Sequence, residues 1–319
     1  MVQLVTVFGG SGFLGKQVVR ALARQGWRIR VAVRKATEAY DLKPMGDVGQ
    51  IQVVRCDVRK EAEIARALDG ASACVNLVGI LYQTSGESFD AIHRQASQRM
   101  AEACVHRGIR DFVQVSALGA DAKAGSKYSA TKGRAEELVR KALPSAVVLR
   151  PGVMFGNGDS FFTSLAAQIK MFPLMPAIGG ANNKFQPVYV GDVAAAVART
   201  LGNGAAHGQT YELGGPEVLA FKDLIKYTAR EILCPRPLVY LPVFAARMIG
   251  VVGDIQAYLP LVPAPLLTTD QVLVLQKDNV VAKGAKGLKD LGIAATAVES
   301  IVPTYLWRFR TNGQFAVAA

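Results

Sequence analysis

The sequence predicts an α/β protein built around a doubly wound parallel sheet. Two observations lead to this prediction. Apolar, strand-like runs alternate with helix-patterned segments over the first 150 residues, and a glycine-rich turn stands between the first strand and the first helix. Such alternation is typical of a parallel sheet that helices cover on both faces, with right-handed crossovers. A chain of 319 residues with a mean hydropathy of +0.22 is long and apolar enough to bury a large core.

The predicted elements follow one another in a regular order. We expect strands at residues 4–8, 28–34, 51–55, 72–78, 111–116 and 146–150, and helices at 61–68, 89–107 and 128–142. Farther along, residues 186–190 are predicted to return to the sheet as a strand, a helix to start near Asp192, and 209–213 to form another strand. Residues 220–306 are predicted to be mostly helical. We therefore expect a Rossmann-type domain over 1–215 and a smaller, mostly helical C-terminal lobe over 216–319, which contributes the substrate or partner side at the carboxyl ends of the strands.

The glycine-rich turn predicts a site for a dinucleotide pyrophosphate, with a merely tight turn as the alternative. Glycines follow the first strand at three-residue spacing. One glycine lets the strand turn sharply, one lets the backbone approach the phosphates, and one lets the helix pack close to the sheet. The N-terminus of the helix offers N–H groups and partial positive charge to the anion. The residues expected at this site are Gly9, Gly12, Phe13, Leu14 and Gly15.

The end of the second strand indicates which dinucleotide is bound. Arg34 and Lys35 stand where an acidic residue would bond the ribose hydroxyls and select NAD. A guanidinium there can pair with a 2′-phosphate, which favours NADPH, and an ordinary solvated strand end is the alternative. Asp57, followed by Val58, is placed to bond the adenine amino group. The segment that passes beneath the adenosine and ribose contains Asn76, Val78 and Gly79.

A tyrosine and a lysine predict acid–base chemistry beside the nicotinamide. Tyr128 and Lys132 are four residues apart and share one helix face. We expect the ammonium to lower the pKa of the phenol, so that Tyr128 acts as general acid in carbonyl reduction or as base in alcohol oxidation.

Composition excludes other classes of site. The three histidines and four cysteines show no ligand spacing, so we expect no metal, and the cysteines are expected to be reduced core thiols. The net charge of +12 lies mainly in the first half, without the interleaved aromatic residues typical of nucleic-acid binding. An anionic membrane face, an acidic partner or a phosphorylated cofactor remain as its counterparts.

Together these motifs resemble the extended short-chain dehydrogenase/reductase superfamily over residues 1–215. The resemblance implies that Lys132 also holds the nicotinamide ribose and that Pro151 and Gly152, after the sixth strand, line the nicotinamide. Active members carry a Ser or Thr hydroxyl after the fifth strand; here Ser116 stands about two positions early and Leu118 takes that place. Leucine cannot donate a hydrogen bond, so the catalytic set is incomplete unless Ser116 serves.

A narrower resemblance covers most of the chain. The segments 7–15, 32–34, 75–79, 116–120, 128–132, 150–152 and 185–192 look like the atypical subgroup that contains the alpha subcomplex 9 accessory subunit of respiratory complex I. The resemblance implies a protein that binds NADPH without evident turnover and lies beside complex I subunits near the quinone (ubiquinone) site. Because Met1 nearly coincides with the first strand, we expect a bacterial relative, cytoplasmic and peripherally associated with the inner membrane, or on the matrix side if mitochondrial.

An apolar stretch in the second half bears on partners. Residues 238–267 carry only two charges, and prolines interrupt them, so a membrane-spanning helix is excluded. The longest helical candidate there is 244–258. These residues form either the wall of a hydrophobic pocket or lobe core, or a surface that docks on a membrane or a membrane protein. The aromatic and basic segment 305–310 favours membrane contact, with a terminal helix packed on the fold as the alternative.

Three functional hypotheses follow. The leading one is an accessory or assembly subunit of complex I that holds NADPH mainly as a structural ligand. The alternative is an active NADP-dependent reductase or epimerase on a hydrophobic or nucleotide-sugar substrate, with Tyr128 as acid/base. A third is a regulator that senses the NADPH level. Whether the protein is an enzyme therefore stays open at this point.

Overall fold

The computed structural model describes residues 3–259 and 265–316 and divides the chain into two compact units. The first unit contains the chain up to Pro151 together with Gly191–Leu213 and Gly284–Ala294. The second contains Gly152–Val190, Gly214–Lys283 and the chain from Ala295 onward. This division differs from a single boundary at residue 215, because the chain leaves the first unit after its sixth strand and returns to it twice.

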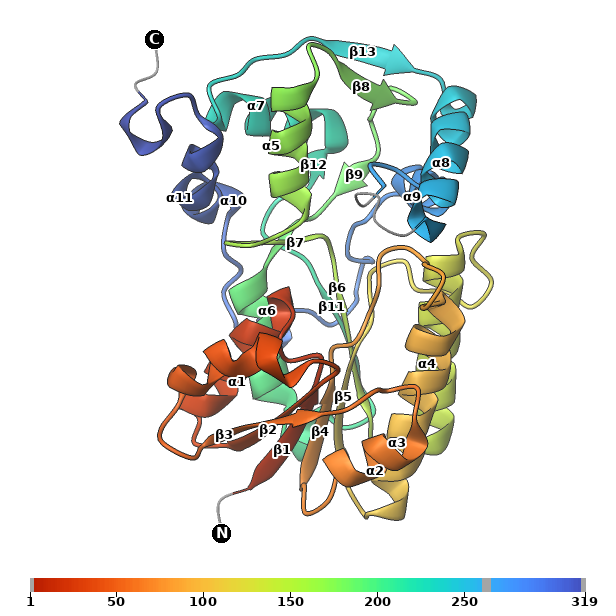
Figure 1. Ribbon diagram of the computed structural model, residues 1–319, viewed down its shortest axis with the longest axis vertical. Helices are drawn as coiled ribbons and strands as arrows, with labels where there is room; N and C mark the ends of the chain where they lie inside the picture. Colours follow the sequence, from red (N-terminus) through yellow and green to blue (C-terminus); the bar gives the residue numbers. More distant parts are fainter. Residues whose placement is uncertain (1–2, 260–264, 317–319) are drawn as a thin grey trace. The chain divides into compact units, whose positions relative to one another are not determined.

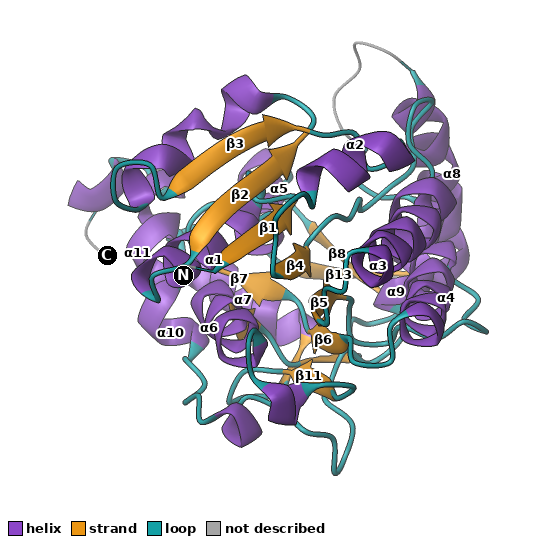
Figure 2. Ribbon diagram, turned by 90° about the horizontal axis from the view of Figure 1, so that it is seen from below, coloured by secondary structure: helices purple, strands orange, loops and turns teal. Residues whose placement is uncertain are grey.

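The first unit holds a seven-stranded parallel sheet with the strand order β3-β2-β1-β4-β5-β6-β11. Helices α1 and α6 lie on one face of this sheet and α2, α3 and α4 on the other (Figures 1 and 2). The predicted doubly wound α/β architecture is thereby confirmed. The strands are β1 (Leu4–Phe8), β2 (Arg28–Val33), β3 (Ile51–Arg55), β4 (Ala73–Asn76), β5 (Asp111–Val115), β6 (Val147–Pro151) and β11 (Thr210–Leu213), and the helices are α1 (Phe13–Arg24), α2 (Glu61–Ala67), α3 (Ala96–His106), α4 (Lys127–Ala142) and α6 (Val190–Thr200).

Burial of apolar side chains explains these elements. The five residues of β1 are apolar apart from Thr6 and almost fully buried, as a central parallel strand requires. Helix α1 places Val18 and Leu22 on one buried stripe, four residues apart. On the opposite face of the sheet, Phe8 and Phe112 lie in one core cluster with side chains of α2, α3 and α4. Each large side chain buried in this way stabilises the fold by about 1.5–3 kcal/mol.

The second unit consists of short strand pairs and helices. Its strands pair as β7 (Met154–Phe155) with β10 (Val188–Tyr189), β9 (Lys184–Phe185) with β12 (Leu219–Ala220), and β8 (Met175–Ile178) with β13 (Leu238–Leu241). An aromatic core that includes Phe155, Phe162 and Phe185 holds the unit together. Its helices are α5 (Phe161–Met171), α7 (Phe221–Glu231), α8 (Val243–Tyr258), α9 (Thr269–Leu275), α10 (Val298–Ile301) and α11 (Pro303–Leu306).

One prediction about this part of the chain needs correction, and another is met in part. Residues 186–190 do not rejoin the main sheet. Val188 instead donates its N–H to the carbonyl of Val153 (2.9 Å). The chain leaves the main sheet after β6, and the segment that follows, 153–155, is the one that pairs with residues 188–189. Of the segment 305–310, Tyr305 and Leu306 are buried in the core of the second unit, as the terminal-helix alternative expects, whereas Trp307 and Arg308 are exposed, so contact of this segment with a membrane stays a prediction.

The apolar stretch 238–267 forms β13 and α8, while 260–264 lie outside the described residues. The helix predicted over 244–258 is confirmed as α8, which begins one residue earlier. Strand β13 was not foreseen in a region predicted to be mostly helical. Within the ranges that the structure describes, no helix combines the length and the apolar composition needed to cross a bilayer.

Candidate nucleotide-binding site

The glycine turn after β1 has no room for side chains. Gly9 has φ +80°, a conformation that residues with a Cβ rarely adopt. A Cβ on Gly15 would lie 2.4 Å from the carbonyl oxygen of Gly9, so glycine is required where α1 crosses the turn. At Gly12 the N-terminus of α1 receives no side-chain cap, which leaves the first N–H groups of Phe13 and its neighbours for a ligand. This cradle fits a pyrophosphate.

The lysine of the predicted pair lies beside the next strand end. The Nζ atom of Lys132 lies 3.3 Å from the position that a Cβ on Gly79 would take. The same Nζ donates a long hydrogen bond to the carbonyl of Val115 (3.4 Å). The Lys132 side chain is buried, and this burial lowers its pKa to about 8, while the carboxylate of Glu136 acts in the opposite direction. An ammonium with three donors and one long hydrogen bond fits the hydroxyls of a ribose.

Tyr128 is held by an aromatic cluster. Its ring packs edge-on against the rings of Phe89 (5.8 Å between centroids) and His93 (5.4 Å). The prediction that Lys132 lowers the pKa of this phenol is wrong: burial raises the pKa of Tyr128 to about 12. Tyr128 is therefore a neutral phenol at pH 7, fit to donate a hydrogen bond.

His93 links the loop after β4 to helix α4 through hydrogen bonds of its two ring nitrogens. Its Nε2 accepts the N–H of Ile80 (3.0 Å), so the proton lies on Nδ1, which donates to Oγ1 of Thr131 on α4 (3.1 Å). Burial, with the Lys132 charge nearby, lowers the pKa of His93 to about 2 and keeps the ring neutral. The segment Asp90–Gln95 is a π-helix that runs directly into α3, a feature frequent at functional sites. Phe89 and His93 were not identified from the sequence as site residues.

The hydroxyl expected after β5 is absent at the position where active relatives carry it. Leu118 is buried and its N–H donates to the carbonyl of Pro151 (2.9 Å), so its side chain serves packing. Two residues earlier, the Oγ of Ser116 is buried, and within the described part of the chain it has no hydrogen-bond partner. A buried hydroxyl without a partner costs about 1–3 kcal/mol, so Ser116 is the hydroxyl available to a ligand here.

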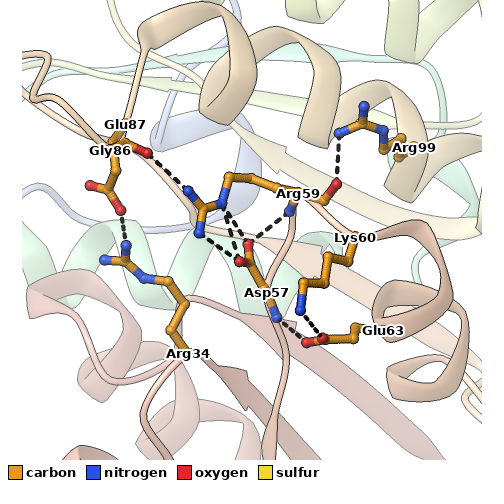
Figure 3. A network of polar contacts seen from close by, with 8 residues as sticks. All are labelled: Arg34, Asp57, Arg59, Lys60, Glu63, Gly86, Glu87 and Arg99. Atoms are coloured by element: carbon orange, nitrogen blue, oxygen red, sulfur yellow. Dashed lines mark hydrogen bonds and ion pairs between the residues drawn. The ribbon is translucent and has the colours of Figure 1, made fainter.

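The predicted adenosine end is a network of charges (Figure 3). Arg34 forms an ion pair with Glu87. Arg59 donates two hydrogen bonds to the carboxylate of Asp57, from Nε to Oδ1 (2.9 Å) and from Nη2 to Oδ2 (2.7 Å). This side-chain contact holds the pKa of Asp57 at about 2. The carboxylate expected to bond adenine is therefore paired within the protein, and neither Glu87 nor Arg59 was singled out from the sequence.

The other predicted residues position the site. Asn76 is fully buried; its Nδ2 donates to Ser97 (3.0 Å) and its Oδ1 accepts the N–H of Val78 (3.0 Å), so it shapes the loop after β4. Val58 lies in the core. The remaining predicted residues are Lys35, whose ammonium pairs with Glu38 at the surface, Pro151, which ends β6, and Gly152, which opens the second unit.

The first unit thus gathers most of the predicted cofactor residues at the carboxyl edge of one sheet. The turn of Gly9, Gly12 and Gly15, the ammonium of Lys132 and the unpartnered hydroxyl of Ser116 fit a dinucleotide. When bound, a nicotinamide dinucleotide supplies hydride chemistry; the chain supplies the cradle and a neutral phenol. In the described ranges, no three His, Cys, Asp or Glu side chains are grouped as a metal site requires.

Comparison with known proteins identifies relatives. The profile of the NAD dependent epimerase/dehydratase family matches residues 5–214. The chain is 35% identical over 97% of its length to NADH dehydrogenase [ubiquinone] 1 alpha subcomplex subunit 9 of Arabidopsis thaliana, covering 79% of that protein. It is 30% identical, also over 97% of its length, to the NADH-ubiquinone oxidoreductase 40 kDa subunit of Neurospora crassa, covering 80%. Its fold is similar to a NADPH-dependent quinone oxidoreductase of Escherichia coli complexed with NADPH (TM-score 0.73, 19% identity, 93% of this chain and 98% of that chain).

Proposed function

The chain belongs to the NAD dependent epimerase/dehydratase family, and within it we propose that the protein is an NADPH-binding accessory or assembly subunit of respiratory complex I. The observation that carries the proposal is the similarity, along nearly the whole chain, to curated subunits of that complex. In this role the nucleotide is mainly a structural ligand.

The site supports a structural rather than a catalytic nucleotide. The parts that hold a dinucleotide are present, from the glycine turn to Lys132. The hydroxyl that would polarise a substrate carbonyl is replaced at position 118 by a buried leucine. A ligand that binds only the folded state at a hundredfold excess over its Kd stabilises the protein by about 2.7 kcal/mol. Binding alone is therefore useful.

Two basic residues support NADPH over NADH. Arg34 and Lys35 follow β2, and their side chains are 59% and 72% exposed, so both are accessible to a 2′-phosphate. An acidic residue at this place would instead favour the free ribose hydroxyls of NADH.

The exposed face of α8 supports docking on an apolar partner. The sequence of this helix is nearly uncharged, and its described side chains include a large apolar set open to solvent. Gly250 and Gly253 pack against the backbone of 267–269, where a Cβ on Gly253 would lie 1.9 Å from the carbonyl oxygen of Leu267; this contact fixes the inner face of the helix. The exposed apolar residues of α8 are Phe244, Met248, Ile249, Val251, Val252, Ile255 and Tyr258, which we call the α8 surface.

The partner proposed for the α8 surface is a membrane subunit of complex I near the quinone site, together with the adjoining membrane surface. Contiguous apolar residues that remain exposed on a folded protein mark an interaction site. The protein then lies at the inner membrane on its cytoplasmic side, or on the matrix side in a mitochondrion.

Affinity purification tests the proposal. The tagged full-length protein is purified from detergent-solubilised membranes of cells that express it, co-purified proteins are identified by mass spectrometry, and the bound nucleotide is released and identified by chromatography. We expect complex I subunits and NADPH. The double variant V252E/I255E places two charges in the α8 surface and should reduce co-purification about tenfold or more, because burying an unpaired charge is costly. Its nucleotide content should stay unchanged.

The variant Val48→Glu is the matched control, since it adds a carboxylate at a fully exposed valine of the first unit. It should co-purify like the wild type. Soluble protein without respiratory subunits would refute the accessory role, and bound NADH in place of NADPH would refute the cofactor preference.

A further inference from the structure

The loop between β4 and the π-helical segment ends in a tight turn. Thr84 and Glu87 form an isolated antiparallel bridge. The N–H of Thr84 donates to the carbonyl of Glu87 (2.9 Å), and the N–H of Glu87 donates to the carbonyl of Thr84 (3.3 Å). The side chain of Glu87 is only 19% exposed. A carboxylate largely withdrawn from water requires a charged partner or several donors.

Two arginines supply that partner and anchor the turn. Arg34, directly after β2, forms the ion pair with Glu87, and Nη1 of Arg59, after β3, donates to the carbonyl of Gly86 (2.9 Å). Figure 3 shows both guanidinium groups converging on residues 86 and 87. Asp57 and the contact of Arg99 with the carbonyl of Arg59 (3.2 Å) hold Arg59 in place. The turn is thus fixed at the strand ends assigned to the adenosine.

The Arg34 guanidinium suits either a carboxylate or a phosphate. Its planar set of donors matches the oxygens of both groups in the same way. With 59% of its side chain exposed, it is accessible to a ligand while it pairs with Glu87. A 2′-phosphate placed against Arg34 would lie close to the carboxylate of Glu87, and like charges at short range repel. The two anions therefore compete for one cation.

We propose that Glu87 is an internal competitor of the cofactor 2′-phosphate for Arg34, and that it sets how strongly the protein prefers NADPH over NADH. In the nucleotide-free protein Glu87 occupies the guanidinium; on binding, the phosphate replaces it and the 84–87 turn gives up its contact with Arg34. NADH, which carries no phosphate there, leaves the ion pair in place. This inference rests on the proposed binding of NADPH.

Calorimetric titration of the full-length protein with NADPH and with NADH tests the competition. The variant Glu87→Gln should bind NADPH about fivefold more tightly, the factor that corresponds to about 1 kcal/mol, the upper end of the range for ion pairs in which one partner is solvent-exposed, as Arg34 is here. Its affinity for NADH should stay within about twofold of the wild type. The matched control is Asp69→Asn, which removes the same charge from an exposed carboxylate that pairs with Arg107 before β4, away from Arg34 and Lys35. It separates competition for Arg34 from a general loss of negative charge and should change NADPH affinity by less than about twofold.

A double-mutant cycle shows whether Glu87 acts through Arg34. In an Arg34→Ala background, which should bind NADPH more weakly, the further change Glu87→Gln should raise NADPH affinity by less than about twofold, because only the direct repulsion between the phosphate and Glu87 remains to be relieved. The inference is overturned if Glu87→Gln raises NADPH affinity equally with and without Arg34. It is also overturned if the variant raises NADH affinity by the same factor, or if it binds NADPH more weakly than the wild type. If Arg34→Ala weakens NADPH binding but Glu87→Gln does not alter it, the competition is refuted while the proposed cofactor stands. If the wild type binds neither nucleotide, the proposed function itself fails.

Discussion

Replacing Gly15 by alanine adds a methyl group where the first unit has no space for it. The new Cβ would lie 2.4 Å from the carbonyl oxygen of Gly9 and 2.6 Å from the carbonyl carbon of Gly10. Ordinary contacts begin at 3.4 Å, so the turn and α1 must separate by about 1 Å. Both contacts are with backbone, which cannot rotate aside. Overpacking of this kind costs about 1–3 kcal/mol, a large share of a typical stability of about 5–15 kcal/mol.

Gly12 provides a matched comparison within the same turn. A Cβ on Gly12 would lie 3.4 Å from the carbonyl oxygen of Gly9, which is an ordinary contact, and its φ of −73° suits alanine. Alanine is a poorer N-cap than glycine by roughly 0.5 kcal/mol, and the lower entropy of the unfolded chain offsets about the same amount. We therefore expect Gly12→Ala to keep wild-type stability. Its methyl group stands at the helix N-terminus that a pyrophosphate would approach, so NADPH binding should weaken about tenfold or more.

Urea denaturation measures the first effect and calorimetric titration with NADPH measures the second. Gly15→Ala should lower the free energy of unfolding by about 1–3 kcal/mol, whereas Gly12→Ala should leave it within about 0.5 kcal/mol of the wild type. The reasoning is refuted if Gly15→Ala is as stable as the wild type. It is equally refuted if Gly12→Ala binds NADPH with unchanged affinity.

Two further predictions concern the cluster around Tyr128. Because the folded-state pKa of His93 is about 2, below the ordinary value of 6.5, the unfolded chain binds a proton that the folded protein does not, and stability falls as the pH drops below 6.5. In urea denaturation at pH 7, 6 and 5, the loss of stability in the wild type should approach about 1.4 kcal/mol per pH unit, and His93→Gln should not show this contribution. If the two proteins lose stability in parallel, the low pKa of His93 is contradicted. If the nucleotide is structural, spectrophotometric assays with quinone, sterol or sugar substrates should detect no NADPH oxidation by the wild type or by Tyr128→Phe. Turnover that Tyr128→Phe abolishes would favour the reductase alternative instead.

Local sequence patterns predicted the main sheet because its elements depend on local chemistry. An apolar run followed by spaced glycines places β1, the turn and α1, and Tyr128 and Lys132 fall on α4 as expected from helical spacing. The strand predicted over 186–190 was assigned to the wrong sheet, because the hydrogen-bonding partner of a two-residue strand is chosen by the path of the chain after Gly152. No local pattern encodes that choice.

The side-chain partners of the site could not be predicted for a related reason. Glu87 lies 53 positions beyond Arg34 in the sequence, and only the parallel order of β2, β1 and β4 brings them together. The contact of Asp57 with adenine stays a prediction, but its pairing with Arg59, two residues later, was not foreseen. The π-helical turn that carries His93 follows a spacing that a search for ordinary helices does not detect.

The polar groups left inside the first unit explain why a nucleotide would be retained without chemistry. Burial depresses the pKa of Lys132 to about 8, and its hydrogen bond to the carbonyl of Val115 is long; Ser116 has a buried hydroxyl with no partner in the described chain. Each such group costs on the order of 1–3 kcal/mol. A catalytic site keeps groups of this kind for a transition state, but here the position expected to carry a second hydroxyl donor is occupied by the buried Leu118. A bound ribose and its phosphates would satisfy the unmet donors in the ground state. The binding energy of the nucleotide would then stabilise the folded protein instead of lowering the barrier of a reaction.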